Sequence, residues 1–225
     1  KRFEAKTGGI IFEAYGLSET APLATANPSN REQRRFGSVG FPTSNTDIKI
    51  VDLETGLTEL PRGEDGEIAI SGPQVMTGYW NKPQENEDAF RSIDGRRFFM
   101  SGDIGHVDEE GYLIITDRKK DMILVGGFNC YPREVEEVIY KHPKVANAAV
   151  IGIPDDRSGE SVKAFIQLLP GEESTEQEII EFCKEHLAGY KRPRAVEFRE
   201  ELPTSLIGKV LRRVLRDEEL DKLGA

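Results

Sequence analysis

Cysteine is scarce in this sequence, and its few cysteines and histidines follow no metal-binding pattern. Cys130 and Cys183 are the only cysteines among 225 residues, and their surroundings do not resemble a secreted disulfide framework. The three histidines, His106, His142 and His186, are scattered without metal-ligand spacing. We therefore expect both cysteines to be reduced and the protein to be intracellular.

An excess of basic residues is also missing, as is a long apolar run. Lys and Arg total 30 against 40 Asp and Glu, and the net charge of −10 argues against non-specific binding to nucleic acid or to an anionic membrane surface. The longest apolar stretches, Met122–Val125 and Val145–Ile153, are too short or too interrupted by glycine to form a transmembrane helix. No signal peptide is recognisable.

What is present is an ordinary globular composition, with 37% hydrophobic and 8% aromatic residues. Up to Asp117 the sequence consists mostly of short strand-like runs separated by Gly and Pro, which begin at Asp47, Gly66, Arg96 and Gly111. After Asp117 strands and helices alternate. The sequence therefore predicts an α+β chain, with a β-rich part followed by a mixed part.

The second part contains recognisable helix signals. A helix is expected to begin at Pro132, because proline suits a first helical turn and apolar residues follow at helical spacing: Val135, Val138 and Ile139. Strands are expected over Val145–Ile153 and Val162–Leu169. Thr175 and Glu178 form the pattern of a capping box for a helix with apolar Ile179, Ile180, Phe182, Cys183 and Leu187. The last helix is expected to begin near Lys209, with apolar Val210, Leu211, Val214 and Leu215 and with Arg212, Arg213 and Arg216 on other faces.

The first candidate motif is Tyr15-Gly16-Leu17-Ser18-Glu19-Thr20, which follows the strand-like run Ile10–Ala14. Hydroxyls and a carboxylate on a turn after a strand are suited to hold a phosphate and a hard cation such as Mg²⁺. The alternative is a polar turn or a helix cap.

A second candidate is Ser101-Gly102-Asp103, after the apolar run Phe98–Met100. A carboxylate at the end of a strand can accept two hydrogen bonds from a ribose diol, as acidic residues do in dinucleotide sites. The same three residues also suit an ordinary turn.

The third candidate is the charged run Asp117–Asp121, followed by Gly126-Gly127. Consecutive glycines let the backbone approach a ligand closely or take a positive φ, and a charged segment between two compact parts can act as a hinge. The alternative is a solvated linker that leads into a β-turn.

The fourth candidate is the segment Pro203–Val210, in which Lys209 follows Gly208. It is not a Walker A motif, because proline stands five residues before Gly208 and no Ser or Thr follows the lysine. A lysine on a loop that contains glycine can still bring a cation to phosphate oxygens. The alternative is a surface lysine at the start of a helix. The basic run Tyr190–Arg194, with Arg199, is interpreted as a solvated turn rather than as a polyphosphate contact.

Taken together, the order and spacing of these motifs closely resemble those of the adenylate-forming superfamily, which includes acyl-CoA synthetases, luciferases and peptide-synthetase adenylation domains. The resemblance covers the whole chain. Ser18 and Ser101 stand where threonine is common in the family, which keeps the hydroxyl. The resemblance implies that residues 1–117 are the C-terminal part of a large AMP-binding domain, and that residues 118–225 are a small mobile domain.

The resemblance also implies roles for individual residues. For the first two motifs it implies that Tyr15 lies against adenine, that Gly16 belongs to the nucleotide site, that Ser18 contacts phosphate, that Glu19 holds Mg²⁺ and that Asp103 binds ribose. For the later motifs it implies a hinge pivot at Asp117, a ribose contact at Arg118, a path for the CoA pantetheine along Gly126-Gly127 and an adenylation lysine at Lys209.

Within the superfamily, the motifs resemble most those of fatty-acyl-CoA ligases. This implies ATP, Mg²⁺ and CoA as cofactors or co-substrates, a medium- or long-chain fatty acid as substrate, and a cytoplasmic protein that meets membranes only peripherally, through its substrate. Two alternatives stay open, an adenylation domain that loads a carrier protein and a non-catalytic nucleotide-binding module. Because the chain opens on Lys1 and lacks the family's upstream phosphate loop, we expect a fragment that is inactive alone.

Overall fold

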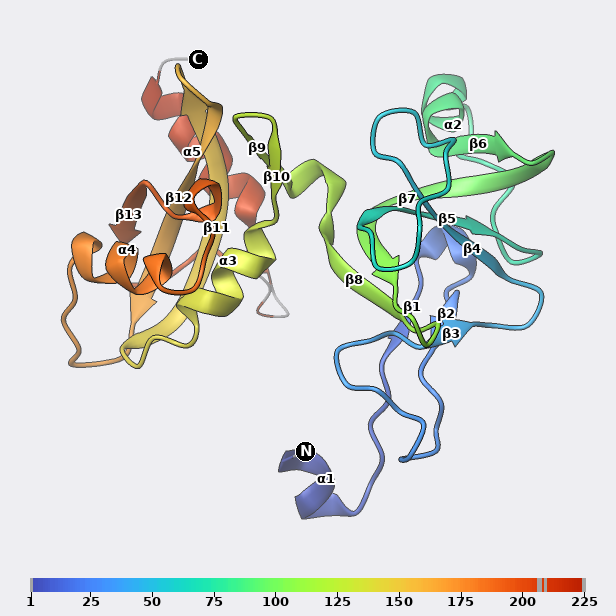
Figure 1. Ribbon diagram of the computed structural model, residues 1–225, viewed down its shortest axis with the longest axis horizontal. Coiled ribbons are helices and arrows are strands. Elements are labelled where there is room, and N and C mark those ends of the chain that lie inside the picture. Colours follow the sequence, from blue (N-terminus) through green and yellow to red (C-terminus); the bar gives the residue numbers. More distant parts are fainter. Residues whose placement is uncertain (1, 206–207, 209, 224–225) are drawn as a thin grey trace. The chain divides into compact units, whose positions relative to one another are not determined.

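The computed structural model describes residues 2–205, 208 and 210–223, and the chain forms two compact units (Figure 1). The first unit spans Lys1–Lys119 and the second Lys120–Ala225. The predicted α+β character is confirmed, because strands dominate the first unit and strands and helices alternate in the second. Each unit is described by itself.

The first unit is built on two antiparallel sheets. A small sheet joins β1 (Ala14–Tyr15), β2 (Thr25–Ala26) and β3 (Phe41–Pro42), and a short helix α1 (Arg2–Thr7) precedes it. The larger sheet has the order β4-β5-β7-β6, with β8 paired to β7; its strands are β4 (Asp47–Val51), β5 (Gly66–Ser71), β6 (Phe90–Ile93), β7 (Arg96–Val107) and β8 (Leu113–Arg118). Helix α2 (Pro83–Ala89) precedes β6.

The larger sheet is covered on both faces, as the apolar run of β5 requires. Ile68 and Ile70 pack with Tyr15 and Leu113 in one apolar cluster, whereas Ala69 packs with Phe98 in another. Successive side chains of a strand point to opposite faces, so β5 contributes to both clusters. The strand-like run Ile10–Ala14, by contrast, is mostly not a strand, because only Ala14 pairs in β1.

The second unit is a five-stranded sheet with helices on both faces. Its strands are β9 (Ile123–Val125), β10 (Phe128–Cys130), β11 (Val145–Asp155), β12 (Gly159–Leu168) and β13 (Ala195–Phe198), and β13 lies parallel to β12. The sheet order is β10-β9-β12-β11. Helices α3 (Pro132–Ile139) and α4 (Glu176–Lys184) cover one face, and α5 (Arg212–Leu223) covers the other (Figure 1).

The alternation of β11 and β12 explains this layering. Val150 and Ala164 face the cluster under α3 and α4, whereas Ile151 and Phe165 face the cluster that contains Leu215 of α5. Both cysteines lie in the first of these clusters, and burial raises the pKa of the Cys183 thiol to about 11. Cys183 is therefore a protonated, packed side chain at neutral pH.

Helix signals in the sequence were right at the starts of α3 and α4 and wrong at the end of α4. Helix α3 begins at Pro132 as predicted. The capping box is only half formed, because Thr175 Oγ1 accepts a hydrogen bond from the Glu178 amide at 3.2 Å while the Glu178 carboxylate binds Lys144 and Ser174. The same helix ends at Lys184, before the apolar residue Leu187 that the prediction included.

The last helix begins at Arg212 and not near Lys209. Val210 instead forms an antiparallel bridge with Thr204, so the apolar spacing that predicted a helix there belongs partly to a bridged segment. Val214 is also not a core residue, since 38% of it is exposed. Of the four predicted apolar helix positions, Leu215 is the fully buried one.

Candidate nucleotide site and glycine hairpin

Tyr15, Asp103 and Arg118 meet in the first unit. The Tyr15 hydroxyl donates a hydrogen bond to Asp103 Oδ2 at 2.7 Å, and both side chains are buried. Arg118 Nε lies 3.3 Å from Asp103 Oδ1. Burial raises the pKa of Tyr15, and the neighbouring Asp103 carboxylate raises it further, so the phenol stays a donor. Three of the predicted nucleotide-binding residues thus form one cluster around a fixed carboxylate.

A bulge within β7 presents Asp103. Met100 pairs with Ala69 and Ile104 pairs with Glu67, so the residues 101–103 lie opposite a single residue of β5. Gly102 has a φ of +71°, and its amide donates to Glu67 Oε1 at 3.1 Å. The expectation that Asp103 ends a strand, and its alternative of an ordinary turn, are both wrong, because β7 continues to Val107. Bulges of this kind redirect a side chain within a sheet.

The motif around Gly16 forms a tight, internally bonded loop. A Cβ at position 16 would lie 1.5 Å from the Pro22 carbonyl oxygen, so only glycine fits there. Thr20 is buried, and its Oγ1 accepts from the Leu17 amide at 2.9 Å. Ser18 is exposed. The loop therefore fixes its backbone through glycine and threonine and leaves the serine hydroxyl outward.

Glu19 belongs to the same loop and is held by a residue that the sequence analysis missed. Its Oε1 accepts a hydrogen bond from the Tyr79 hydroxyl at 2.8 Å, and its carbonyl accepts from the Met76 amide at 2.9 Å. Burial, followed by the bond to Glu19, raises the pKa of Tyr79 to about 12. Nothing in the local sequence around Tyr79 points to this contact, since it joins positions 60 residues apart.

Glu67 is a second residue that sequence reasoning missed. It is 5% exposed on β5, and its Oε2 lies 2.7 Å from Lys119 Nζ while its Oε1 accepts from Gly102. A carboxylate within the otherwise apolar run of β5 was the available signal. Asp117 is also buried, and its Oδ1 accepts from the Arg118 amide at 2.8 Å. At the end of the first unit, strand β8 and the following residue Lys119 thus carry charged groups that are held by hydrogen bonds or ion pairs.

In the second unit, Gly126 and Gly127 form the two-residue turn of the hairpin β9–β10. Phe128 pairs with Val125, and the two glycines have φ values of +59° and +86°. Such a turn favours positive φ at both central positions, which explains the glycine pair. No described atom lies within 4 Å of a Cβ built at either position. The space around the turn is therefore open, while its backbone conformation favours residues that accept a positive φ.

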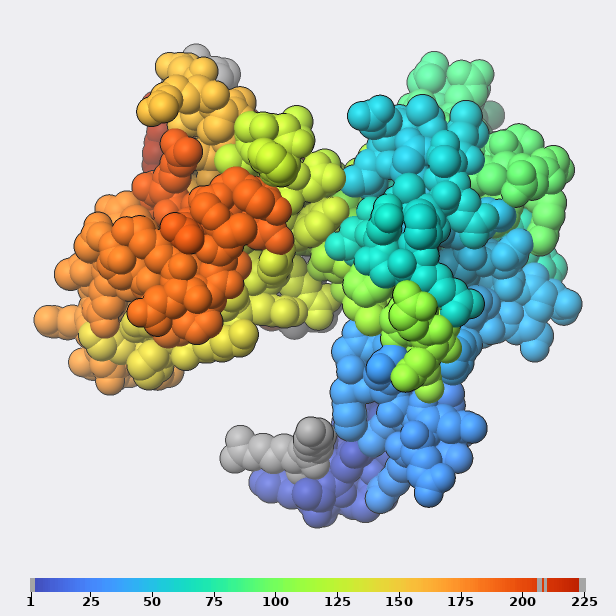
Figure 2. Space-filling view, in the orientation of Figure 1, coloured from blue at the N-terminus to red at the C-terminus, as the bar shows by residue number. Residues whose placement is uncertain are grey.

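The strand after this turn carries Phe128, an aromatic side chain that is 61% exposed. Phe128 stacks on Tyr190 with ring centroids 5.0 Å apart. Figure 2 shows the lime-coloured hairpin at the surface of the unit, beside the orange residues of η3 (Gly189–Lys191). The neighbouring basic residues have internal partners: Lys191 binds Glu134, and Arg199 binds Glu197 and Glu218. Lys191 and Arg199 are thus neutralised within the unit and are mostly buried, whereas the sequence analysis interpreted the basic run as a solvated turn.

Lys209 lies outside the described residues, so the structure gives no geometry for its side chain. The segment around it is closed at its base. The Leu211 amide donates to the Pro203 carbonyl at 2.8 Å, and Thr204 bridges Val210. The Gly208 amide donates to the Ser205 carbonyl at 2.8 Å. The segment Pro203–Leu211 is called the lysine loop below.

Over residues 2–205, 208 and 210–223, no group of three or more His, Cys, Asp or Glu side chains is arranged to hold a metal ion. Within the same residues, no helix has the length and apolar character needed to cross a bilayer.

Comparison with known proteins finds a family-model match within each unit. Residues 1–80 match the family model for an AMP-binding enzyme, and residues 134–209 match that for the AMP-binding enzyme C-terminal domain. The chain is 48% identical over 221 residues to a long-chain-fatty-acid–CoA ligase of Bacillus subtilis, and 46% identical over 223 residues to one of Escherichia coli O6:H1. These matches cover 98% and 99% of the chain, but the chain spans only 38% of either relative.

Solved structures agree with this comparison. The structure of ATP-bound MatB from Rhodopseudomonas palustris matches with a TM-score of 0.88 and 39% identity. The match covers 98% of this chain and 42% of that one.

Proposed function

This chain belongs to the adenylate-forming superfamily of AMP-binding enzymes, and from this premise we propose that the protein containing it is a fatty-acyl-CoA ligase. It would join a medium- or long-chain fatty acid to CoA at the expense of ATP. The similarity to long-chain-fatty-acid–CoA ligases over nearly the whole chain supports the substrate class. We further propose a cytoplasmic location, with membrane contact made peripherally through the poorly soluble acid.

The cluster of Tyr15, Asp103 and Arg118 is the observation that carries the proposal. A carboxylate has about four lone-pair sites, so Asp103 can accept from a ribose diol while it keeps its bonds to Tyr15 and Arg118. Arg118 is half-exposed and can itself donate to ribose. We assign the ribose to this carboxylate and the adenine to the Tyr15 ring.

Ser18 and Glu19 are proposed to serve the phosphates. Mg²⁺ is usually bound by one or two carboxylates together with water and substrate phosphates, so one protein carboxylate on a rigid loop fits its needs. Glu19 is half-buried, and within the described residues its second oxygen, Oε2, takes part in no hydrogen bond or ion pair. Bound there, Mg²⁺ would neutralise phosphate charge. Ser18 would donate its exposed hydroxyl to a phosphate oxygen.

The proposed reaction has two steps. A carboxylate oxygen of the acid attacks the α-phosphorus of ATP, and pyrophosphate leaves; the CoA sulfur, having lost its proton, then attacks the acyl carbon, and AMP leaves. We assign Lys209 to the phosphates in the first step and the open turn of Gly126-Gly127 to the pantetheine in the second. Residues 118–225 would act as the mobile domain, with Asp117 as the pivot.

Half-reactions of the complete protein test this assignment. Lys209→Ala should lower acyl-adenylate formation by about 10²–10³-fold, the usual cost of removing one charge-stabilising group, and should lower thioester formation from supplied acyl-adenylate far less. Pyrophosphate exchange and thioester release measure the two steps. Lys184→Ala is the matched control, because Lys184 is an exposed lysine of the same unit paired with Glu181.

Two results would contradict the proposal. Equal losses in both half-reactions for Lys209→Ala would refute the assignment of the lysine to the first step. A panel of saturated acids from acetate to palmitate tests the substrate class, and activity confined to the shortest acids would exclude a fatty-acyl-CoA ligase.

A further inference from the structure

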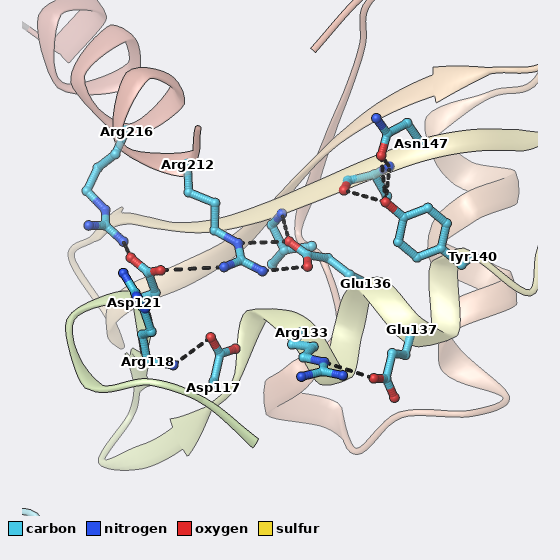
Figure 3. A network of polar contacts seen from close by, with 12 residues as sticks. Asp117, Arg118, Asp121, Arg133, Glu136, Glu137, Tyr140, Asn147, Arg212 and Arg216 are labelled. Carbon is cyan, nitrogen blue, oxygen red and sulfur yellow. Dashed lines mark hydrogen bonds and ion pairs between the residues drawn. The ribbon is translucent and has the colours of Figure 1, made fainter. Parts of the chain in front are cut away.

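A buried carboxylate on α3 holds the first residue of α5. Glu136 Oε2 accepts from Arg212 Nη2 at 2.6 Å, and Glu136 Oε1 accepts from Arg212 Nε at 3.0 Å (Figure 3). Glu136 Oε1 also accepts from the Val150 amide at 2.8 Å, so the carboxylate is fixed to the sheet as well. Two parallel bonds between guanidinium and carboxylate define an orientation, which a single contact does not.

Asp121 extends this contact to the segment at the start of the second unit. Its Oδ2 lies 3.4 Å from Arg212 Nη1, and its Oδ1 lies 3.8 Å from Arg216 Nη2, one turn further along α5 (Figure 3). The Lys120 carbonyl accepts from Arg216 Nη1 at 3.5 Å. The first turn of α5 is therefore tied both to α3 and to the residues that follow the proposed hinge in sequence.

This network stands at one end of the lysine loop. Arg212 directly follows Leu211, whose amide closes the base of the loop. At the other end, Leu202 is buried in the same apolar cluster as Leu215 of α5. Both ends of the loop are thus anchored, one by apolar packing and the other by the pair of Glu136 and Arg212.

Burial of an ion pair is weak evidence for added stability, because desolvation of both charges opposes their attraction. Its clearer effect is to select one geometry. We propose that Glu136 and Arg212 are a positioning pair, which sets the place of the lysine loop for the adenylation step. Asp121 connects this pair to the segment after the hinge. The inference rests on the proposed function, since it assumes that Lys209 acts in adenylation.

The first test uses Glu136→Gln in the complete protein. Glutamine keeps the size of the side chain but places an amide donor opposite an Arg212 donor, so the bidentate contact between the two side chains is lost. Adenylation should fall by about 10–100-fold, the range expected for a displaced catalytic group, while thioester formation from supplied acyl-adenylate changes by less than about 3-fold. Glu137→Gln is the control, because Glu137 is the next residue, is 62% exposed and, among the described residues, forms a surface pair with Arg133.

A second pair of variants tests the geometry of the bidentate contact between Glu136 and Arg212. Arg212→Lys keeps the charge but removes the bidentate contact, so adenylation should again fall more than thioester formation. Arg213→Lys should have no effect, because its side chain is 91% exposed. Hydrogen exchange of peptides from the lysine loop should be faster in Glu136→Gln and Arg212→Lys than in either control. Unchanged exchange in the loop would overturn the positioning role, and this readout does not depend on activity.

The double variant Lys209→Ala with Glu136→Gln decides whether Glu136 acts through the lysine. Adenylation by the double variant should be no lower than that of Lys209→Ala alone. Losses that multiply, or equal losses of both half-reactions in Glu136→Gln, would overturn the inference. If Lys209→Ala leaves adenylation unchanged, the proposed function fails; if it suppresses adenylation and Glu136→Gln does not, the inference alone fails.

Discussion

The open turn between β9 and β10 allows a test of backbone strain without steric interference. Gly127 has a φ of +86°, and no described atom lies within 4 Å of an added Cβ, so Gly127→Ala introduces conformational strain alone. An L residue in the left-handed region costs about 1–2 kcal/mol. This corresponds to a change of roughly 5–30-fold in the ratio of folded to unfolded molecules.

Asparagine and a second glycine provide the controls. Gly127→Asn should cost less than Gly127→Ala, since asparagine tolerates the left-handed region better than alanine. Gly189 is open in the same way but does not have a positive φ. Gly189→Ala should therefore be neutral or stabilise the unit by about 0.4–1 kcal/mol, through the lower entropy of the unfolded chain.

Hydrogen exchange of the slowest amides in β11 and β12 measures these differences, because such amides exchange through unfolding of the whole unit. Their exchange should accelerate by roughly 5–30-fold in Gly127→Ala and by a smaller factor in Gly127→Asn, given the same 1–2 kcal/mol cost. An unchanged rate in Gly127→Ala would refute the reasoning. So would a larger effect for asparagine than for alanine.

Two further predictions concern the face of the second unit that α5 covers. Leu215→Ala should lower the free energy of unfolding in urea by about 2–5 kcal/mol, because Leu215 is fully buried. Val214→Ala should lower it by no more than about 0.5 kcal/mol, because Val214 is exposed. Similar losses for the two variants would contradict this packing. Burial alone would raise the pKa of Glu197, but three cations lower this pKa from 4.5 to about 2. The ionised Glu197 carboxylate therefore contributes fully to stability above about pH 4.5, and this contribution is lost as the pH falls toward 2. Glu197→Gln should flatten this part of the stability curve, and an unchanged acid limb would contradict the role of its partners Lys163, Arg199 and Lys222.

Local patterns predicted those parts of the fold whose signals are local. The start of α3 at Pro132 follows from the fixed φ of proline, and β11 follows from a run of apolar residues that begins at Val145. The interior of β7 was misjudged, because the bulge at Gly102 depends on Glu67 of another strand. The start of α5 was misjudged for a similar reason, since Val210 pairs with Thr204.

Individual site residues were visible in the sequence, but their contacts were not. Tyr15 and Asp103 are 88 residues apart, and only the resemblance to a family joined them before the structure did so. Glu136 and Arg212 are 76 residues apart and were not predicted to meet. A signal existed for Glu136, because it stands four residues after buried Pro132 and three before buried Ile139, on the apolar face of α3. A charge at such a position requires a partner, but the sequence does not say which one.

The bond between Tyr79 and Glu19 links the proposed nucleotide site to an optical reporter. Trp80, the only tryptophan of the sequence, directly follows Tyr79 and is 89% exposed. We expect a cation or phosphate that draws Glu19 away from the Tyr79 hydroxyl to change the surroundings of the Trp80 indole as well, because Trp80 is the next residue. We expect that occupancy of the proposed site can be followed without a label, by the fluorescence of Trp80 excited selectively over the six tyrosines of the sequence.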